Sequence, residues 1–261
     1  MNEENTLIEM LTNKQKLVAM LAPSFPIVYE YPKIITMLKK LGFSYVVEVS
    51  AGAKKTNEEL VELMKKNPEA RYITSPCPTI VSMVRKTMPE YAKYFTQGVD
   101  SPMVATAKIA REAYPGYTPV FIGPCVMKKI EAKEVPELDI LVLTYIELAH
   151  VFKHFNLPEE TNPNDHFDIS APGMTRLYPV DGGLSHSSGV TNKVEEGAVK
   201  VVSGAQDNIN AIKEFDTNQK IKLLDILNCP GGCIGGPGIK SDLTTDQRKQ
   251  KIFEYTQNVK E

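Results

Sequence analysis

The four cysteines are the residues of this chain best suited to carry chemistry, and two of them share one glycine-rich turn. The stretch NCPGGCIGGPG, residues 228–238, places Cys229 and Cys233 four positions apart with only proline and glycine between them. Glycines let the backbone approach an inorganic cluster closely and donate N–H groups to its sulfur atoms. This spacing therefore indicates two thiols that bind a metal or an iron–sulfur cluster.

The other two cysteines each follow a predicted strand. Cys77 lies in TSPCPTIVSMV, between a strand end and a helix start, and Cys125 lies in FIGPCVMKKIEA, directly after a strand. In a parallel α/β sheet the carboxyl ends of the strands form the ligand-binding crevice, and helix N-termini there stabilise thiolates. Four thiols from three proline-containing turns match the ligands of one 4Fe-4S cubane.

Two other interpretations of the cysteines stay open on spacing alone. Free cysteine is a common core residue, so any one of these thiols taken singly favours inert packing. A structural zinc ion also takes four thiolates, but it usually takes them from two short-spaced pairs. This chain has one short pair, spaced CxxxC, and two isolated cysteines. The pattern favours an iron–sulfur cluster over zinc without excluding zinc.

The elements that must position these thiols follow from hydrophobic periodicity. Short β-rich runs alternate with longer helical patterns, which predicts an α/β fold with two lobes of mostly parallel sheet flanked by helices and the metal cluster in the cleft between them. Strands are expected at 16–23, 44–52, 71–75, 119–123, 138–144 and 198–204. Helices are expected at 27–42, 56–67, 79–88, 103–114, 145–155, 205–215 and 244–259, with a further helix start within 182–190.

Local signals refine these boundaries. Gly42 is expected to end the first helix, and Thr56 with Glu59 three positions later predicts a capping box at the start of the second. The segment 156–173 is rich in proline, asparagine and acidic residues, so we expect it to be an excursion between the lobes. Residues 1–261 are predicted to form a single catalytic domain without an accessory ferredoxin-like domain, because the chain has no CxxCxxC run.

Composition limits the partners. The chain has 261 residues, 42% of them hydrophobic, which is enough to bury a core. Its net charge of -2 argues against nucleic acid or an anionic membrane as a partner. The first residues, MNEENTLIEMLTNKQKLVAM, lack an apolar run of signal-peptide length, and no apolar segment is long enough to span a bilayer. Four cysteines are too few for a disulfide scaffold. These features predict a cytoplasmic protein.

From about residue 15 to its C-terminus, the chain resembles the catalytic domain of the iron-iron hydrogenases. Three motifs carry the resemblance in family order: TSPCP at 74–78, PCVMKKIEA at 124–132 and CPGGCIGG at 229–236. Weaker similarities are LAPSFP at 21–26, SPM at 101–103 and VDGGLSH at 180–186. The resemblance implies an H-cluster, in which a 4Fe-4S cubane shares one cysteine thiolate with a diiron subcluster carrying CO, cyanide and a bridging dithiolate amine.

The resemblance also implies roles for single residues. All four cysteines would hold the cubane, and Cys233 would also bridge to the diiron subcluster. Lys128 would donate a hydrogen bond to a cyanide ligand, although a solvated lysine beside Lys129 is the plainer interpretation. The residues expected to line or shape the cofactor site are Pro23, Ser24, Gly123, Pro124, Gly182, Gly183 and Gly232.

Several positions depart from the pattern of the active members. Pro76 stands where they carry a proton-relaying cysteine, and proline cannot carry a proton. Gly123 and Leu227 replace methionines, and Met103 takes a position often held by a polar residue. Every metal ligand remains, so this combination is similar to the divergent, sensory subfamilies and implies low activity.

The resulting prediction is an H-cluster protein that catalyses slow, reversible H2 oxidation and proton reduction or senses H2. Its expected partners are H2 and protons, hydrogenase maturation proteins, and an external electron-transfer or signalling protein that is ferredoxin-like or a partner subunit. The alternative is a hydrogenase-related iron–sulfur protein that carries only a 4Fe-4S cluster and acts in cluster assembly or as a redox interaction module.

Overall fold

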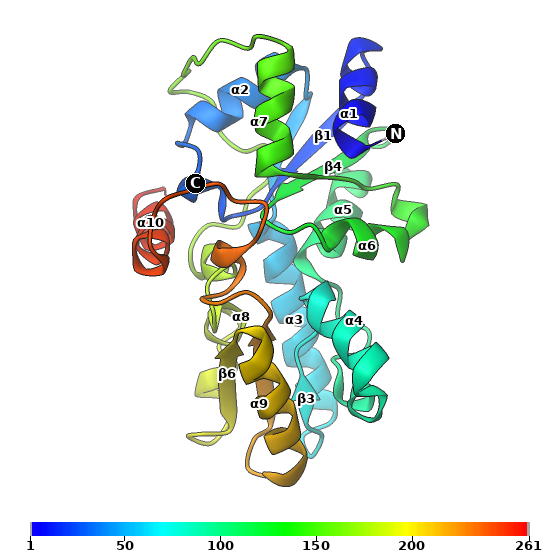
Figure 1. The fold of residues 1–261 in the computed structure, drawn as a ribbon, viewed down its shortest axis with the longest axis vertical. Helices are drawn as coiled ribbons and strands as arrows, with labels where there is room; N and C mark the ends of the chain where they lie inside the picture. Colours follow the sequence, from blue (N-terminus) through cyan, green and yellow to red (C-terminus); the bar gives the residue numbers. More distant parts are fainter. Residues whose placement is uncertain (1, 260–261) are drawn as a thin grey trace.

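Two separate parallel sheets divide the molecule into an upper and a lower lobe (Figure 1). The structure is a computed structural model that describes residues 2–259. In spatial order, the upper sheet consists of β2 (Tyr45–Glu48), β1 (Leu17–Leu21), β4 (Thr118–Gly123) and β5 (Leu141–Thr144). The lower sheet consists of β3 (Tyr72–Ile73), β7 (Leu223–Leu227) and β6 (Val199–Ser203). All paired strands run parallel, as the sequence predicts.

The upper sheet is covered on both faces, which explains why its strands are continuous apolar runs. Every residue of β1, LVAML, is buried, and the strand pairs in register with β4 so that Leu21 lies beside Ile122. The helices around this sheet are α1 (Glu3–Thr12), α2 (Lys33–Leu41), α5 (Pro102–Ala113), α6 (Lys128–Lys133) and α7 (Tyr145–His154). Their buried apolar residues form one core with the strands.

The lower sheet has its own core, and one long helix links it to the upper lobe. This helix, α3 (Ser50–Lys66), begins after β2 and extends down along the lower sheet (Figure 1). It packs closely on α5 at Gly52, where an added Cβ would lie 2.3 Å from the Pro102 carbonyl oxygen. The remaining helices of this lobe are α4 (Pro78–Thr87), α8 (Gly183–Ser187) and α9 (Ala205–Thr217).

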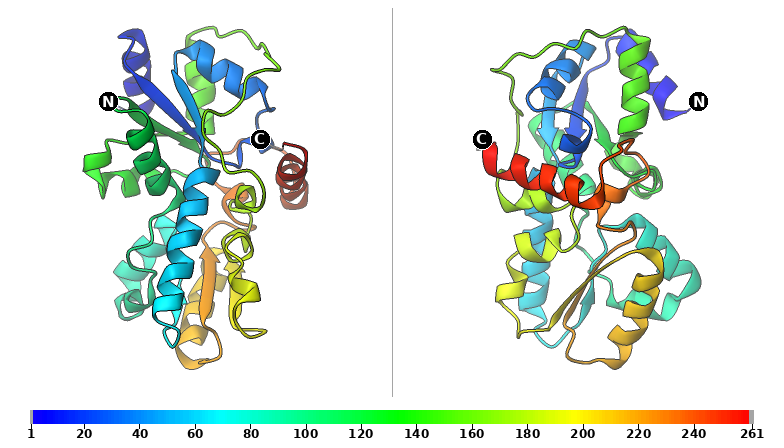
Figure 2. Two further views of the ribbon diagram at one scale, coloured as in Figure 1. Left: turned by 180° about the vertical axis from the view of Figure 1, so that it is seen from behind. Right: turned by 60° about the vertical axis from the view of Figure 1, so that its left-hand side comes forward.

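The C-terminal helix lies on the flank of the molecule near the junction of the two lobes (Figure 2). This helix, α10 (Thr245–Asn258), contacts three short 3-10 turns: η1 (Phe25–Ile27), η4 (Met174–Leu177) and η6 (Cys233–Gly235). Thr244 and Gln247 form a capping box at its start. Because η6 contains Cys233, the helix supports one of the cysteine turns.

The predicted fold class is confirmed, but three local predictions are wrong. The strand expected at 44–52 ends at Glu48, and the helix expected from Thr56 already begins at Ser50. Thr56 therefore lies inside α3 and caps nothing; its hydroxyl donates to the carbonyl oxygens of Gly52 and Asp100. The capping-box pattern misled because tertiary contacts use both side chains: Glu59 accepts from the Asp100 N–H at 2.9 Å.

The first predicted helix is also shorter than expected. Residues 27–32 precede α2, which begins at Lys33 after Pro32, a residue that the interior of a helix does not accommodate. Gly42 does end this helix, with φ of 122°. The strand β7 was not predicted at all, because its run LLDIL is short and contains an aspartate.

The segment 156–173 leaves α7 and runs along the outer edge of β2 before it reaches η4. The Asp168 N–H donates to the Val46 carbonyl at 2.8 Å, and Ile169 forms an isolated parallel bridge with Val47. Ion pairs hold the segment to α2, including Lys33 with Glu159 at 2.6 Å. Within residues 2–259, no helix is both long and apolar enough to cross a membrane.

Candidate metal centre

The three cysteine turns lie at the carboxyl ends of strands from both sheets. Cys77 precedes α4 in the connection from β3, and Cys125 follows β4 of the upper sheet. Cys229 and Cys233 follow β7, the central strand of the lower sheet. The carboxyl ends of both parallel sheets therefore supply thiols to the junction between the lobes, as expected for a ligand site in an α/β fold.

Glycines hold the turn of Cys229 and Cys233 against its neighbours. The Gly238 N–H donates to the Pro124 carbonyl at 2.8 Å, and an added Cβ on Gly236 would lie 2.5 Å from the same oxygen. Gly232 has φ of 100° and forms a bridge with Val180, where a Cβ would lie 2.5 Å from the Pro179 carbonyl oxygen. Side chains at these positions would push the cysteine turns apart.

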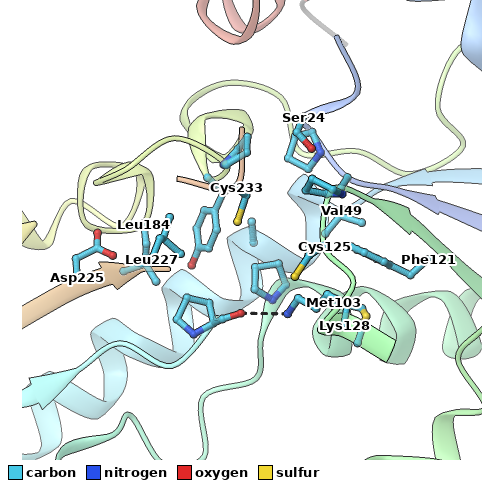
Figure 3. A pocket seen from close by; sticks show the side chains of 18 residues that line it. Ser24, Val49, Met103, Phe121, Cys125, Lys128, Leu184, Asp225, Leu227 and Cys233 are labelled. Atoms are coloured by element: carbon cyan, nitrogen blue, oxygen red, sulfur yellow. Dashed lines mark hydrogen bonds between the residues drawn. The ribbon is translucent and has the colours of Figure 1, made fainter. Parts of the chain in front are cut away.

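Lys128 joins the turn of Cys125 to the turn of Cys77 (Figure 3). Its ammonium donates to the Pro76 carbonyl and to the Ser101 hydroxyl, both at 3.1 Å, and pairs with Glu131. The residue is only 9% exposed, whereas Lys129 turns away and pairs with Glu147 at 2.5 Å. The structure therefore places Lys128 at the site and Lys129 outside it.

The thiols lie close enough to affect one another electrostatically. Burial raises the pKa of the Cys125 thiol; the Lys128 ammonium lowers it, Cys77 raises it, and the Met127 and Lys128 N–H groups lower it. Burial, followed by the Cys125 and Cys77 thiols, raises the pKa of Cys229 to about 11.

The pKa of the Cys233 thiol is affected by the other three thiols. Burial and then Cys77, Cys125 and Cys229 hold the pKa of its thiol well above the ordinary value, against the opposing effect of Lys128. Burial and the neighbouring thiols thus disfavour the thiolates of Cys125, Cys229 and Cys233, and a bound cationic cluster would stabilise these thiolates and displace their protons. Within residues 2–259, no group of three or more His, Cys, Asp or Glu side chains could hold one metal ion. A cubane does not need such a group, because each cysteine binds a different iron.

A cavity of about 80 Å³ adjoins the thiols at the junction of the lobes (Figure 3). Most of the predicted site residues line it: Pro23, Ser24, Pro76, Pro124, Cys125, Lys128 and Cys233. Cys77 and Cys229 lie outside its wall, and Cys77 packs in the lower core with Cys233 beside it. Ser24 is fully buried, and its hydroxyl lies 2.8 Å from the Tyr145 hydroxyl, which in turn donates to the Ala22 carbonyl.

The positions at which the resemblance implies departures from the active hydrogenases lie around this cavity. Pro76, Met103 and Leu227 line it directly. At Gly123 an added Cβ would lie 2.6 Å from the ring of Phe121, which also lines the cavity. The phenyl ring therefore occupies the space beside the glycine, where a larger side chain would collide with it.

The sequence analysis missed two polar residues that line the cavity. Asp225 is 2% exposed on β7, and Tyr178 is 9% exposed at the end of η4. A signal existed for Asp225, since a lone acid inside the apolar run LLDIL has to be buried when that run forms a central strand. Among the histidines, His150 is exposed and contacts Glu4 at 3.2 Å, away from the thiols.

Residues 15–237 match the family described as "Iron only hydrogenase large subunit, C-terminal domain". The chain belongs to this family. The matched span contains all four cysteines and the complete lining of the cavity.

Curated relatives of the chain share about a quarter of their residues with it. A NADP-reducing hydrogenase subunit, HndD, of Solidesulfovibrio fructosivorans is 23% identical, and iron hydrogenase 1 of Clostridium pasteurianum is 25% identical. Each alignment covers 79% of this chain and 45% of the relative. A probable cytosolic Fe-S cluster assembly factor, oxy-4, of Caenorhabditis elegans is 24% identical over 86% of this chain and 61% of its own length. The chain thus spans about half the length of these relatives.

Solved structures show the same fold. A variant of the FeFe-hydrogenase HydA1 from Chlamydomonas reinhardtii superposes with a TM-score of 0.73 at 18% identity, covering 99% of this chain and 89% of that one. An apo form of another HydA1 variant gives a TM-score of 0.72 over 97% and 88% of the two chains, also at 18% identity. At this identity the match shows the hydrogenase fold.

Proposed function

We propose that this chain binds an H-cluster and catalyses slow, reversible oxidation of H2 to protons and electrons. One observation carries the proposal: four thiols from both lobes meet beside a cavity that Cys233 and Lys128 line. When bound, the diiron subcluster would supply the Lewis acid and the bridging amine that split H2. The protein would supply ligands, orientation and a closed environment.

The residues around the cavity suit these roles. Cys77, Cys125, Cys229 and Cys233 would hold the cubane, with Cys233 shared with the diiron subcluster. Lys128 Nζ, oriented by the Pro76 carbonyl and Ser101, would donate to an anionic cyanide ligand. Pro23, Ser24, Pro124 and Gly232 would shape the pocket.

Apolar side chains would keep water from the reacting centre. Val49, Phe121 and Leu227 line the cavity together with Met103, and each of the four is less than a tenth exposed. Exclusion of water strengthens the charge–dipole interactions inside such a site. The donor set and the apolar wall therefore both suit the cluster.

Pro76 supports a slow enzyme or an H2 sensor. Its ring lines the cavity and offers no exchangeable proton. Electrons would leave through the cubane to an external electron-transfer or signalling protein, and maturation proteins would load the diiron subcluster. In this proposal the chain resembles the divergent, sensory hydrogenases.

Infrared spectroscopy tests the proposal. The purified chain is reconstituted with iron, sulfide and a synthetic diiron precursor, and we expect absorption bands from bound CO and cyanide. A preparation that shows the cubane by electron paramagnetic resonance but never the CO and cyanide bands would refute the H-cluster.

The ligand assignment has its own test. Cys77→Ala, Cys125→Ala and Cys229→Ala should each reduce cubane loading, because each removes one of the thiolates that the cluster needs. Cys233→Ala should also prevent attachment of the diiron subcluster. Iron content and electron paramagnetic resonance spectra measure both effects. Normal cubane spectra in all four variants would show that the ligands are elsewhere.

A further variant tests whether Pro76 limits turnover. Pro76→Cys keeps the carbonyl that binds Lys128 and adds a thiol at the cavity, so H2 turnover should rise by about 10²-fold if a missing proton carrier limits the rate. Pro76→Ala controls for the loss of the rigid ring before Cys77. Equal rates in the two variants, at equal cluster loading, would place the limit elsewhere.

A second function rests on the similarity to the Caenorhabditis elegans assembly factor. In that case the chain would carry only the cubane and act in cluster assembly or as a redox interaction module. The infrared experiment separates the two functions, since a cubane alone has no CO or cyanide bands.

A further inference from the structure

Asp225 is the one carboxylic acid that lines the cavity among the described residues. It lies on β7, the central strand of the lower sheet, and is 2% exposed. Figure 3 shows it at the end of the cavity away from Cys125 and Lys128, next to Leu184 and Leu227. A buried acid at this place needs an explanation, because burying a carboxylate costs free energy unless it is paired.

The contacts of Asp225 are few. Its Oδ2 accepts from the Ser185 N–H at 3.1 Å, and its Oδ1 accepts from the Thr74 hydroxyl at the long distance of 3.5 Å. No lysine or arginine within residues 2–259 forms an ion pair with it. Asp225 is therefore incompletely neutralised, although it lies deep in the protein.

Titratable groups face Asp225 from several elements. Burial raises the pKa of the Asp225 carboxyl, and Ser185, Thr74 and, least, His186 on α8 lower it. Burial and then Asp225 raise the pKa of Tyr178 at the end of η4. Lys128 and Cys233 line the same cavity, and β6 contributes Val201 beside Asp225 in the sheet. Burial is the largest influence and raises the pKa of Asp225 above its ordinary range.

We propose that Asp225 is the proton carrier of this cavity. The proposal rests on the proposed function. When H2 is split, the Asp225 carboxylate would accept a released proton, directly or through one water molecule, and become a carboxylic acid. Loss of that proton to the outside restores the carboxylate, so the residue is unchanged after each cycle and takes no electrons. In proton reduction the same proton moves inward.

His186 offers the outward step. It is the residue after Ser185, it is exposed on α8, and its charge acts on Asp225. Imidazole commonly shuttles protons between a buried acid and solvent. The route from the cavity through Asp225 to His186 does not include Pro76, so it does not depend on the position that cannot carry a proton.

A purely structural role predicts different behaviour. As an acceptor for the Ser185 N–H, the side chain of Asp225 stabilises the first turn of α8. Asparagine keeps an acceptor oxygen of the same size at that place but cannot carry a proton. Asp225→Asn therefore separates the two roles, and Asp181→Asn is the matched control, because Asp181 is partly exposed and pairs with Lys249 outside the cavity.

In the reconstituted protein we expect Asp225→Asn to lower H2 turnover by about 10²-fold with unchanged CO and cyanide bands. The pH–rate profile should lose the limb that reports this acid, whereas Asp181→Asn should keep both rate and profile. A variant with full bands, wild-type rate and wild-type profile would overturn the proposal and leave the H-cluster assignment intact. Absence of the bands from wild-type protein would instead refute the proposed function.

A readout without the cluster gives an independent test. Infrared difference spectra of the cluster-free protein, recorded during a pH titration in water and in D2O, should show the C=O stretch of a protonated carboxylic acid that Asp225→Asn removes and Asp181→Asn keeps. If the wild-type and Asp225→Asn spectra titrate identically, Asp225 does not change protonation and the proposal is wrong.

The transfer of the proton from Asp225 to solvent is tested by changing His186, whose side chain is exposed. His186→Gln should slow turnover less than Asp225→Asn, and free imidazole in the buffer should restore the rate. If His186→Gln turns over at the wild-type rate, the exit through His186 is refuted.

Discussion

Two buried carboxylic acids, one in each lobe, show how differently the fold treats the same chemical group. Glu48 is fully buried at the end of β2 in the upper lobe, and Asp225 is 2% exposed on β7 in the lower lobe. Arg176 Nε lies 3.0 Å from both oxygens of Glu48, which also accepts from the Tyr255 hydroxyl at 2.6 Å. Asp225 has one backbone N–H and a distant hydroxyl.

The difference follows from what each acid connects. Arg176 on η4 also donates to the Val259 carbonyl and lies 4.5 Å from the Tyr255 ring centre, so the Glu48 cluster joins β2, η4 and α10. Burial raises the pKa of the Glu48 carboxyl, while the arginine and the hydrogen bonds from Tyr255 and Ser50 oppose that effect and hold the carboxyl in place. Asp225 lines a cavity and its carboxyl has no paired cation among the described residues, so we infer that it is free to gain and lose a proton. The two acids are equally buried, but Glu48 stabilises the contacts between elements of the fold, whereas Asp225, we infer, transfers protons.

The largest expected effect is at the Glu48 cluster. Arg176→Met should lower the free energy of unfolding by about 3–5 kcal/mol, because it leaves the Glu48 carboxylate buried without its cation. Urea denaturation measures the change. Lys200→Met is the control: its ion pair with Glu214 is a surface pair, and its loss should cost about 1 kcal/mol or less. Equal effects in the two variants would show that Glu48 is not held as an ion pair.

The next effect concerns the hydroxyl that completes this cluster. Tyr255→Phe should destabilise the protein by about 1.5–3 kcal/mol, the usual range for a hydrogen bond to a charged group. In the control Tyr94→Phe, the lost hydroxyl contacts Asp216 at the surface, and the change should stay within about 0.5 kcal/mol. Thermal denaturation of both variants checks the comparison; a neutral Tyr255→Phe would mean that Arg176 alone satisfies Glu48.

The smallest expected effect is the pH dependence of stability that comes from the Asp225 carboxyl. Because burial raises its native pKa above the unfolded value of about 3.9, the native state binds more protons in the window between the two pKa values. Wild-type stability should therefore fall as pH rises through this window, by up to about 1.4 kcal/mol per pH unit from this group.

Asp225→Asn should remove the contribution of this carboxyl, so the free energy of unfolding should depend less on pH. Unfolding free energies of both proteins from about pH 4 to about pH 7 give the difference, in which Glu48 cancels because both proteins contain it. Parallel curves for the two proteins would show that the pKa of Asp225 is the same in the folded and unfolded states.

Local sequence patterns determined much of this structure in advance. The alternation of apolar strands with amphipathic helices gave the α/β class and placed Cys77 and Cys125 in turns after strands, because a strand, a turn and a helix start are encoded by neighbouring residues. The glycines around Cys229 and Cys233 predicted a close backbone approach, which the contacts at Gly232, Gly236 and Gly238 show. The resemblance to the hydrogenases depended on these same local motifs.

Only the tertiary structure decided the features that depend on residues far apart in the chain. Thr56 and Glu59 have the pattern of a capping box, yet both bind the loop at Asp100, which no local rule includes. Glu48 and Arg176 are separated by 128 positions, so the sequence does not show that one neutralises the other. Asp225 becomes a cavity residue only because β7 is the central strand and its carboxyl end meets the upper lobe. Local motifs identify the four cysteines as candidate ligands, and only the packing of the two lobes brings Asp225 to the cavity beside them.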